Sequence, residues 1–351
     1  MVGKMKAAVL HALGDIRSEV VDIPQINDHE VLIKVKYCGI CGSDVPRSMI
    51  SGARKYPLIL GHEFSGVVVE TGKHVDNVAV NDRVVVAPLV PCGQCSYCQE
   101  SNYGLCENYN IIGTGSNGAF AEYVKVPKKH VLPIGDSLDF ETATGVEPAT
   151  IGYYGLQKAN ILPGETAVVM GCGSIGQLTI QWAKIFGAST VIAVDIFDEK
   201  LELAKRLGAD VIINSKETDP VKEIRKLTNG GADIVAETAG SVITQQQAIL
   251  AAKKKGRVVF LGITHKGLDL KEETMDHVLR GEVTIKGSWN SYAPPYPGLA
   301  WKATLDFMEK GALQFKPIIS HKITVDQVGE FLRGMADRTL RYNKVLVSFD
   351  N

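Results

Sequence analysis

The sequence predicts an α/β protein in which a mostly-β domain is joined to a doubly wound parallel sheet. From Glu165 onward, short β-branched runs alternate with helical patterns, which is typical of parallel strands buried on both faces. Before about residue 135, the chain carries short β segments separated by Gly, Pro, Asn and Asp. A length of 351 residues is long for a single hydrophobic core, so we expect two domains.

The mostly-β domain is expected to cover residues 1–150. Short apolar runs bounded by turn-forming residues predict its strands at Ala7–Leu10, Val31–Tyr37, Gly66–Glu70, Arg83–Ala87 and Ala121–Val126. The pattern changes after Pro133, and Asp139–Leu156 has the apolar spacing of a helix.

The parallel-sheet domain is expected to cover residues 151–290. Its predicted strands are Ala167–Met170, Val191–Asp195, Val211–Ile213, Ile234–Ala236, Val258–Leu261 and Val283–Lys286. Helical patterns lie between these strands: Ile175, Leu178, Trp182 and Ile185 recur at helical spacing, and Gly208 is a candidate C-cap. Six strands alternating with helices indicate a doubly wound sheet.

The last part of the chain, residues 291–351, no longer alternates in this way. Its patterns predict helices at Trp301–Lys310 and Val325–Met335 and a final strand at Lys344–Phe349. We interpret this segment as a return of the chain to the first domain.

Composition excludes several classes of function. The net charge is -1, which argues against broad electrostatic binding to nucleic acid or to an anionic membrane. No apolar run approaches the ~20 residues of a membrane span. The first ten residues lack the apolar core of a signal peptide, so we expect a cytoplasmic protein.

Four of the seven cysteines are concentrated in one short run. They are Cys92, Cys95, Cys98 and Cys106. Four thiolates complete a tetrahedral shell around Zn²⁺ and leave no open position, so such a site is structural and not catalytic. The alternative is a pair of disulfides, which would require an oxidising compartment; the absence of a signal sequence and the scarcity of other cysteines favour the metal.

A glycine-rich turn follows the first strand predicted in the second domain. Its residues are Gly171, Gly173, Ser174, Ile175 and Gly176. One glycine would form the turn, one would let the backbone approach a pyrophosphate, and one would let helix and strand pack closely. Because the motif lies between a predicted strand and a predicted helix, it indicates a dinucleotide site.

Asp195 ends the next predicted strand, 19 residues after Gly176. A carboxylate at this position can accept hydrogen bonds from ribose hydroxyls and would repel a 2′-phosphate, so we expect NAD in preference to NADP. Lys200 is assigned to the same cofactor site. The alternative for Asp195 is an N-cap of the helix around Asp198–Leu207, and Cys172 inside the turn is interpreted as a small buried residue.

Residues far apart in sequence suggest a second metal site. They are Cys41, His62, Glu63 and Glu147. One thiolate, one imidazole and one or two carboxylates can hold Zn²⁺ and leave a position open for substrate. Spacing alone favours the alternatives, in which Cys41 is a core residue, His62 a loop histidine and Glu147 a surface charge.

These motifs together resemble one protein family. Gly39–Asp44, Gly61–Glu63, the Cys92–Cys106 run and Gly171–Gly176, in this order, resemble the zinc-dependent medium-chain alcohol dehydrogenases over essentially the whole chain. Within the family, the polyol branch is most similar. The stretches that carry this likeness are Cys41–Arg47, Tyr56–Gly66, Gly287–Tyr292 and Pro295–Trp301.

The resemblance implies a fold, a metal site and an assembly. The expected fold is a GroES-like β domain that carries both zinc ions, with a Rossmann domain inserted before the C-terminal segment. Cys41, His62 and Glu147 would surround the catalytic zinc, and Glu63 would be a further or exchanging ligand. Cys38 matches no ligand position and is interpreted as a core thiol. Homodimers or homotetramers are expected.

The reaction implied is the reversible oxidation of a secondary hydroxyl of a polyol or polyol phosphate to a ketone, with zinc as Lewis acid and NAD as hydride acceptor. Ser43 is the candidate acceptor of the alcohol proton, unless its hydroxyl bonds only local backbone. Asp44 is expected to orient His62. Many family members carry a relay histidine where this chain has Pro46, so water, Glu63 or the cofactor ribose would have to take the proton.

Substrate choice is left open by the sequence. Arg47, Arg54 and Lys55 could clamp a phosphate or could form a solvated loop. Ser288–Tyr292 and Tyr296–Trp301 could line the substrate pocket or a surface between domains or subunits. The alternatives are a sorbitol (L-iditol) or L-threonine dehydrogenase, a zinc-lacking quinone reductase that uses NADPH, and a non-enzymatic zinc-containing binding protein.

Overall fold

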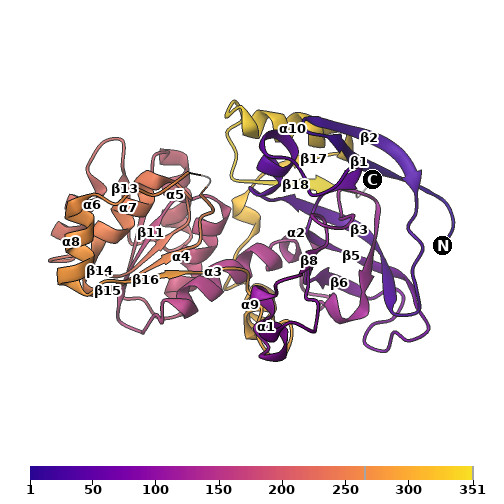
Figure 1. Ribbon diagram of the computed structural model, residues 1–351, viewed down its shortest axis with the longest axis horizontal. Coiled ribbons are helices and arrows are strands. Elements are labelled where there is room, and N and C mark those ends of the chain that lie inside the picture. Colours follow the sequence, from indigo (N-terminus) through magenta and orange to yellow (C-terminus); the bar gives the residue numbers. More distant parts are fainter. Residues whose placement is uncertain (265, 350–351) are drawn as a thin grey trace. The chain divides into compact units, whose positions relative to one another are not determined.

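A computed structural model describes residues 1–264 and 266–349. The chain forms two compact units (Figure 1). The first consists of Met1–Glu147 and Tyr292–Asn351, and the second of Pro148–Ser291. No helix among the described residues is both long enough and apolar enough to cross a membrane.

The second unit is built on a six-stranded parallel sheet of order β13-β12-β11-β14-β15-β16. The strands are β11 (Thr166–Met170), β12 (Thr190–Asp195), β13 (Val211–Asn214), β14 (Ala232–Glu237), β15 (Ala252–Phe260) and β16 (Thr284–Gly287). Val168, Ile192 and Val235 are fully buried, because helices connect successive strands and cover the sheet. These helices are α4 (Ser174–Ile185), α5 (Asp198–Arg206), α6 (Pro220–Leu227), α7 (Val242–Ala251) and α8 (Glu272–Gly281). The predicted fold class, with a strand at each predicted position of this sheet, is confirmed.

The strand order reverses between β11 and β14. From β11 the chain builds outward through β12 and β13, then crosses to β14 on the other side of β11. Ligands of doubly wound sheets bind at this point, outside the carboxyl ends of the strands. The glycine turn that starts at Gly171 follows β11 directly.

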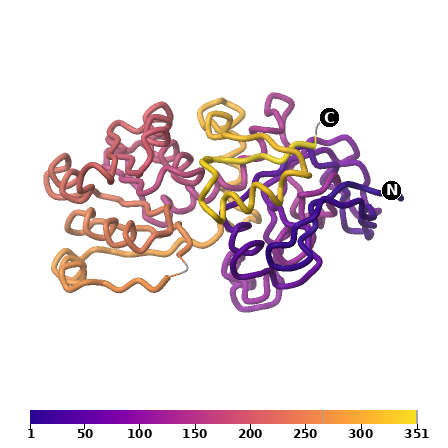
Figure 2. The backbone as a smooth tube through the Cα atoms, turned by 90° about the horizontal axis from the view of Figure 1, so that it is seen from above, coloured from indigo at the N-terminus to yellow at the C-terminus, as the bar shows by residue number. Residues whose placement is uncertain are grey.

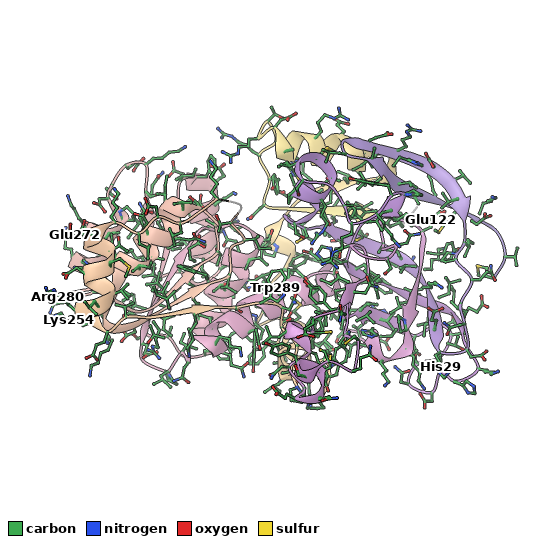
Figure 3. All side chains as sticks on the ribbon, viewed as in Figure 1. His29, Glu122, Lys254, Glu272, Arg280 and Trp289 are labelled. Atoms are coloured by element: carbon green, nitrogen blue, oxygen red, sulfur yellow. The ribbon has the colours of Figure 1, made fainter. Side chains whose placement is uncertain are left out.

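The surface of the second unit carries charges of both signs. Lys254, Glu272 and Arg280 are exposed, and Figure 3 shows their side chains extending outward from the start of β15 and from α8. Oppositely charged neighbours such as Asp276 and Arg280 form ion pairs. The unit therefore presents mixed charges at this face.

The first unit is mostly β. Its largest sheet has the order β10-β6-β5-β3-β18-β17, with β9 paired to β3, and a second sheet has the order β2-β1-β4. The strands of the large sheet are β3 (Glu30–Ile40), β5 (Glu63–Thr71), β6 (Arg83–Val86), β9 (Tyr123–Pro127), β10 (Val131–Pro133), β17 (Ile319–Ile323) and β18 (Lys344–Ser348). The second sheet consists of β1 (Lys4–Ala12), β2 (Asp15–Asp22) and β4 (Leu58–Ile59).

The C-terminal segment contributes directly to this unit. It adds α9 (Leu299–Glu309), α10 (Val328–Ala336), β17 and β18. Strand β18 pairs with β3, with Val345 opposite Ile40, and Figure 2 shows the last part of the chain running beside the N-terminal strands. Residues more than 300 positions apart therefore meet at the carboxyl end of β3.

The structure differs from the predicted elements at several places in this unit, and the short strands β4 and β10 and strand β17 were not predicted. Asp139–Leu156 is not one helix but two, α2 (Phe140–Ala143) and α3 (Val146–Lys158). A Cβ at Gly145 would lie 2.3 Å from the Phe315 ring, so the break admits that ring. Strand β2 was not predicted, because most of its side chains are exposed or only partly buried and lack an apolar pattern.

Candidate active site

The four cysteines of the Cys92–Cys106 run come together in the first unit. Their sulfur atoms all lie within 4.8 Å of one another, and the Cys92 amide donates to the Cys106 sulfur at 3.2 Å. Two short helices hold them, α1 (Ser96–Gln99) and η2 (Tyr103–Leu105). All seven cysteines belong to the described residues, and each is a free thiol. Four converging sulfurs fit a tetrahedral zinc site better than two disulfides.

Backbone amides stabilise the thiolate form of two of these cysteines, and the thiolate is the form that binds a metal ion. The amides of Gln94 and Cys95 lower the pKa of Cys92 to about 6, and the amides of Glu107 and Cys98 lower the pKa of Cys95. Burial instead raises the pKa of Cys98 to about 12. A bound cation would remove that penalty, because it stabilises the thiolate form.

A second cluster forms where β3 ends and β5 begins. Cys41 follows the last residue of β3, His62 precedes β5, and Glu63 opens it. Because Gly39 pairs with Glu63 in the antiparallel register of these strands, the chain segments on either side meet. The ligand atoms of Cys41, His62 and Glu63 lie within 4.8 Å of one another.

Asp44 is fully buried beside this cluster and contacts Cys41 and His62. One of its carboxylate oxygens accepts a hydrogen bond from the Cys41 amide at 2.9 Å, and the other lies 3.6 Å from Nδ1 of His62. At 3.6 Å this is an ion-pair contact and not a hydrogen bond, and it turns the Nδ1 side of the imidazole toward the Asp44 carboxylate. Burial raises the pKa of Asp44, while the imidazole of His62 acts in the opposite direction.

Lys344 is a residue of this site that sequence reasoning missed. Its side chain is 3% exposed, it forms an ion pair with the buried carboxylate of Glu63, and it donates to the Ile40 carbonyl at 3.0 Å. Burial alone would lower the pKa of Lys344, but the negative charge of Glu63 raises it overall. The signal in the sequence was a lysine at the start of an apolar final strand.

Glu147 lies near the trio without joining it. It stands in the first turn of α3, and among the described residues the group within 4.8 Å comprises Cys41, His62 and Glu63. Burial, with the nearby charge of Glu63, raises the pKa of Glu147 to about 7. Burial and the carboxylates of Glu63 and Asp44 also raise the pKa of Cys41.

The donor set of this second cluster fits a zinc ion. A thiol, an imidazole and several carboxyl groups converge in a buried site where Lys344 is the one fully buried cation among the described residues. So many acidic groups together disfavour one another's ionised forms unless a divalent cation offsets their charge. Cys38, also buried, belongs to neither group of ligands among the described residues.

Ser43 and Arg47 form a short chain of hydrogen bonds beside Cys41. The Ser43 hydroxyl lies 3.2 Å from the Cys41 sulfur and accepts from the Arg47 guanidinium at 2.8 Å. Arg47 also lies 3.9 Å from the Asp44 carboxylate. Arg54 instead stands over the Tyr109 ring at 5.8 Å, so of the two arginines it is Arg47 that contacts the residues around the cluster.

The aromatic residues of the 292–301 segment pack into the first unit. Tyr292 is 4% exposed and its hydroxyl accepts from the Leu89 amide, while the Tyr296 hydroxyl donates to the Leu89 carbonyl at 2.6 Å. Trp301 is buried as well. These contacts hold β7 (Leu89–Val90), the short strand that precedes the four-cysteine run. The aromatic side chains therefore have a packing role.

The glycine turn of the second unit has the predicted geometry. Gly171 has a φ of 95°, and a Cβ at Gly176 would lie 1.9 Å from the Gly171 carbonyl oxygen. The first helical residue of α4 is Ser174, with Gly173 as its N-cap. Helix and strand thus approach at a distance that only glycine permits.

Asp195 and Lys200 lie next to this turn. One carboxylate oxygen of Asp195 accepts from the Cys172 amide at 2.6 Å, and the other accepts from the amides of Ile196 and Phe197. Asp195 does not cap α5, whose N-cap is Phe197. The Lys200 amine stands over the Phe197 ring at 5.4 Å. Gln177, which sequence reasoning also missed, is buried and donates to the Cys172 and Lys200 carbonyls.

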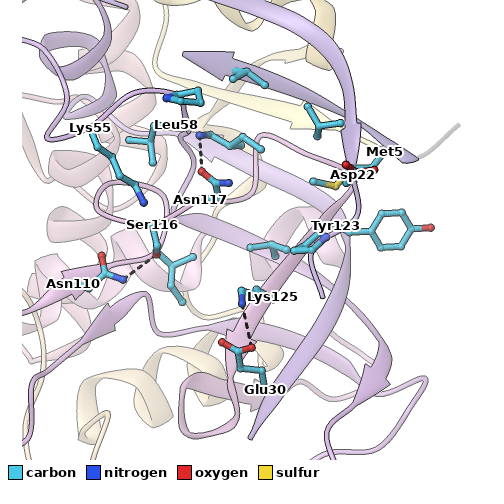
Figure 4. Close-up of a pocket in the computed structure, with 18 of the residues that line it drawn as sticks. Met5, Asp22, Glu30, Lys55, Leu58, Asn110, Ser116, Asn117, Tyr123 and Lys125 are labelled. Carbon is cyan, nitrogen blue, oxygen red and sulfur yellow. Dashed lines mark hydrogen bonds and ion pairs between the residues drawn. The ribbon is translucent and has the colours of Figure 1, made fainter. Parts of the chain in front are cut away.

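A separate cavity of about 490 Å³ opens elsewhere in the first unit (Figure 4). Apolar residues such as Leu58 and Ile112 line it together with Lys55, Ser116 and Tyr123. The cysteines and acidic residues of the two clusters are not part of its wall, so it is distinct from the metal sites.

Comparison with known proteins places the chain in a family. Its residues 27–136 match the alcohol dehydrogenase GroES-like domain, and residues 174–310 match the zinc-binding dehydrogenase domain. Galactitol 1-phosphate 5-dehydrogenase of Escherichia coli (strain K12) is 35% identical over 98% of this chain and 99% of its own. The chain belongs to the zinc-binding medium-chain dehydrogenases. It is therefore a zinc-dependent dehydrogenase acting on a CH–OH group, and the alternative of a non-enzymatic zinc protein is excluded.

Other members of this family are about as similar. Sorbitol dehydrogenase of Bacillus subtilis (strain 168) is 36% identical over 92% of this chain and 91% of its own, and L-threonine 3-dehydrogenase of Bacillus velezensis is 35% identical over 93% and 94%. Because three activities occur at nearly equal identity, similarity alone does not assign the substrate of this medium-chain dehydrogenase.

Solved structures share its fold. The crystal structure of galactitol-1-phosphate dehydrogenase from Escherichia coli has a TM-score of 0.93 at 34% identity, covering 98% of this chain and 100% of the other. A zinc-binding dehydrogenase from Sinorhizobium meliloti 1021 bound to NADP has a TM-score of 0.92 at 34% identity, with 99% of each chain covered. An alcohol dehydrogenase from Escherichia coli complexed with NADH reaches 0.88 at 28%, again over 99% of each chain. The fold is thus the GroES-like and Rossmann architecture.

Proposed function

We propose that this dehydrogenase oxidises a secondary hydroxyl of a polyol phosphate, galactitol 1-phosphate in the first instance, to a ketone with NAD. The observation that carries the proposal is the convergence of the partly buried Cys41 with the buried His62 and Glu63, beside Arg47. The similarity to galactitol 1-phosphate 5-dehydrogenase over the full length supports the choice of substrate.

We propose two zinc sites in each chain. Cys41, His62 and Glu63, with Glu147 nearby, would hold the catalytic ion, and the four-cysteine cluster would hold a structural ion. When bound, zinc supplies Lewis acidity at the substrate hydroxyl, and the nicotinamide ring accepts hydride. The four-sulfur shell has no open position, so the reaction is assigned to the first site.

The surrounding residues position these ligands. Asp44 would orient the imidazole of His62 through its 3.6 Å contact with Nδ1. Lys344 holds the carboxylate of Glu63 in an ion pair beside Cys41, so Glu63 would keep a positively charged partner when it is not a ligand of the metal.

Ser43 is proposed to take the proton of the substrate alcohol. A hydroxyl oxygen has two lone pairs, and Arg47 occupies one of them, which leaves the other for the substrate. On taking this proton, Ser43 would release its own hydroxyl hydrogen, and since Pro46 has no side-chain proton acceptor, that hydrogen would pass to water, Glu63 or the cofactor ribose. Glu147, whose pKa is raised to about 7, could also exchange a proton near neutral pH.

The cofactor site is proposed to comprise Gly171, Gly173, Ser174, Ile175 and Gly176 together with Asp195 and Lys200. The carboxylate of Asp195 favours NAD over NADP by repelling a 2′-phosphate. Structural relatives bind NADP in one case and NADH in another, so the preference has to be measured on this chain. We further propose that the second unit is the cofactor domain and that the chain assembles into homodimers or homotetramers.

Steady-state kinetics with a substrate panel test this proposal. The panel pairs galactitol 1-phosphate with galactitol and adds sorbitol and L-threonine, each with NAD and with NADP. We expect the highest kcat/KM for galactitol 1-phosphate with NAD. A preference for sorbitol or L-threonine would instead assign the activity of the corresponding relative.

The role of Arg47 in recognising phosphate has a matched control. Arg47→Gln should raise the KM for galactitol 1-phosphate about tenfold or more, because a charge-assisted contact to phosphate is lost. The KM for galactitol, which lacks the phosphate, should rise much less. Arg54→Gln should leave both KM values unchanged. An equal increase in KM for the two substrates would show that Arg47 acts only through Ser43.

A further inference from the structure

A buried glutamate stands at the point where the strand order of the parallel sheet reverses. Glu237 is the last residue of β14 and pairs in register with Met170, the last residue of β11. Its exposed fraction is 0%. Burying a carboxylate is costly unless hydrogen bonds or an opposite charge compensate for the lost contact with water.

One oxygen of the Glu237 carboxylate accepts hydrogen bonds from the loop that follows β14 and from the first turn of α7. It accepts hydrogen bonds from the amides of Ala239 and Gly240, each at 2.9 Å, and from the Thr244 hydroxyl at 2.8 Å. Burial raises the pKa of Glu237, and these donors act in the opposite direction. The carboxylate therefore fixes the chain between β14 and α7 in one conformation.

The loop fixed in this way lies against the glycine turn. The Thr238 hydroxyl donates to the Gly171 carbonyl at 2.8 Å, and the Thr238 amide donates to the Met170 carbonyl at 2.9 Å. A Cβ built at Gly171 would lie 2.9 Å from that of Ala239, and one at Gly176 would lie 3.0 Å from the Thr238 hydroxyl. A displacement of this loop would thus move the turn.

Glu237 is also hydrogen-bonded to the loop that follows β15. Its backbone carbonyl accepts from the amides of Leu261 and Gly262. The two loops interlock, since a Cβ at Gly262 would lie 2.1 Å from the Gly240 nitrogen and 2.9 Å from the second carboxylate oxygen of Glu237. That second oxygen has no hydrogen-bond partner among the residues described.

We propose that Glu237 is a positioning residue of the cofactor site: its carboxylate holds the 238–241 loop against the Gly171–Gly176 turn and so sets the affinity for the cofactor diphosphate. The inference rests on the proposed binding of a nicotinamide dinucleotide. Glu237 acts through Thr238 and Gly171 and does not itself touch the reacting atoms.

Binding measurements without substrate test this role. We expect Glu237→Gln to raise the Kd for NADH and for ADP-ribose by a common factor of about ten, since a hydrogen-bonded charge is lost. The KM for NAD should rise in parallel, while kcat at saturating NAD stays within about twofold, because positioning of the bound cofactor's diphosphate affects binding more than chemistry.

A second variant and a control keep the test decisive. Thr238→Val removes the hydroxyl that donates to Gly171 and should raise the same two Kd values by a smaller factor, even if Glu237→Gln fails to fold. Glu202→Gln, the same chemical change at an exposed residue of α5, should leave both unchanged.

Three results separate the outcomes. Unchanged Kd values in both variants, with only a lower Tm, would overturn the proposal and leave Glu237 with a structural role. Nucleotide binding that responds to Glu237 in a protein that oxidises no polyol would refute the proposed substrate and support the role of Glu237. A native protein that binds neither NADH nor ADP-ribose would refute both.

Discussion

At the scale of single residues, the active site depends on a lysine that is buried together with its partner. Lys344 and Glu63 are 3% and 1% exposed and form an ion pair beside Cys41. A buried pair adds little stability over an apolar pair, but removal of one member leaves the other charge uncompensated. The site therefore depends on both residues being present.

Lys344→Met should lower the free energy of unfolding by about 3–5 kcal/mol, because it strands the Glu63 carboxylate in the interior. Adding Glu63→Gln should recover part of that loss. Lys302→Met, at an exposed position of α9, serves as control and should change stability by less than about 0.5 kcal/mol. Chemical denaturation of the four proteins measures this, and equal effects at Lys344 and Lys302 would contradict the assigned role.

A second residue-scale prediction concerns His130, away from both metal clusters. The ring is 5% exposed, Nδ1 lies 3.0 Å from the Ala87 carbonyl oxygen and 2.8 Å from the Tyr296 hydroxyl, and burial lowers the pKa to about 4. The unfolded chain therefore binds more protons than the folded chain between its ordinary pKa of about 6.5 and pH 4. The contribution of His130 to stability is therefore complete above about pH 6.5 and decreases as the pH falls from about 6.5 to about 4.

His130→Gln should remove this dependence. Between pH 7 and pH 5 the native protein should lose about 2 kcal/mol more stability than the variant. Denaturation curves at the two pH values measure the difference, and His74→Gln, an exposed histidine, should behave like the native protein. Parallel losses in native protein and His130→Gln would show that His130 titrates normally.

At the scale of secondary-structure elements, three strands assemble the catalytic cluster. Strand β3 lies between β5 and β18, which places Cys41, Glu63 and Lys344 at one end of the sheet. Gly39 lies beneath the ion pair: a Cβ there would stand 2.4 Å from a Glu63 carboxylate oxygen and 2.8 Å from Lys344 Cε. Strand β3 therefore requires glycine at position 39, because a side chain there would displace the ion pair.

Gly39→Ala should therefore displace the ion pair and lower stability by about 1–3 kcal/mol, the usual effect of overpacking. Turnover should fall as well, since Glu63 would leave its place beside Cys41. Gly42→Ala is the matched control, because a Cβ at Gly42 meets nothing within 4 Å. Thermal unfolding and steady-state assays compare the two, and an unaffected Gly39→Ala would refute the packing argument.

The four-cysteine loop is the second element with a testable role. Cys95→Ser removes one sulfur from a closed shell, so we expect the loss of one zinc per chain and a Tm lower by several degrees. Metal analysis and thermal unfolding of the same preparation measure both. Full stability in Cys95→Ser would contradict a structural zinc.

The sequence predicted elements better than their contacts. The six strands of the parallel sheet were predictable because fully buried strands are apolar runs with clear boundaries, whereas the exposed strand β2 had no such pattern. The helix break at Gly145 was hidden, because it depends on Phe315, which is distant in sequence. Cys41, His62 and Glu63 were found by motif. Lys344, Gln177 and Glu237 were not, since their roles arise from strand pairing and loop contacts.

At the scale of the whole molecule, two units divide the work. The first gathers two groups of metal-binding side chains, and the second carries the glycine turn at the reversal of its strand order. One cluster is closed by four sulfurs and the other combines sulfur, nitrogen and oxygen donors. The account therefore requires that the two metal sites can be lost independently.

Zinc content and turnover of Cys41→Ser, measured on one preparation beside the native protein, test this claim most directly. The native protein should hold two zinc ions per chain, one in each cluster, and the variant one. The variant should keep a Tm close to that of the native protein, since the four-cysteine cluster is intact, and should show no detectable oxidation of galactitol 1-phosphate. Native turnover in Cys41→Ser, or fewer than two zinc ions in the native protein, would contradict the account.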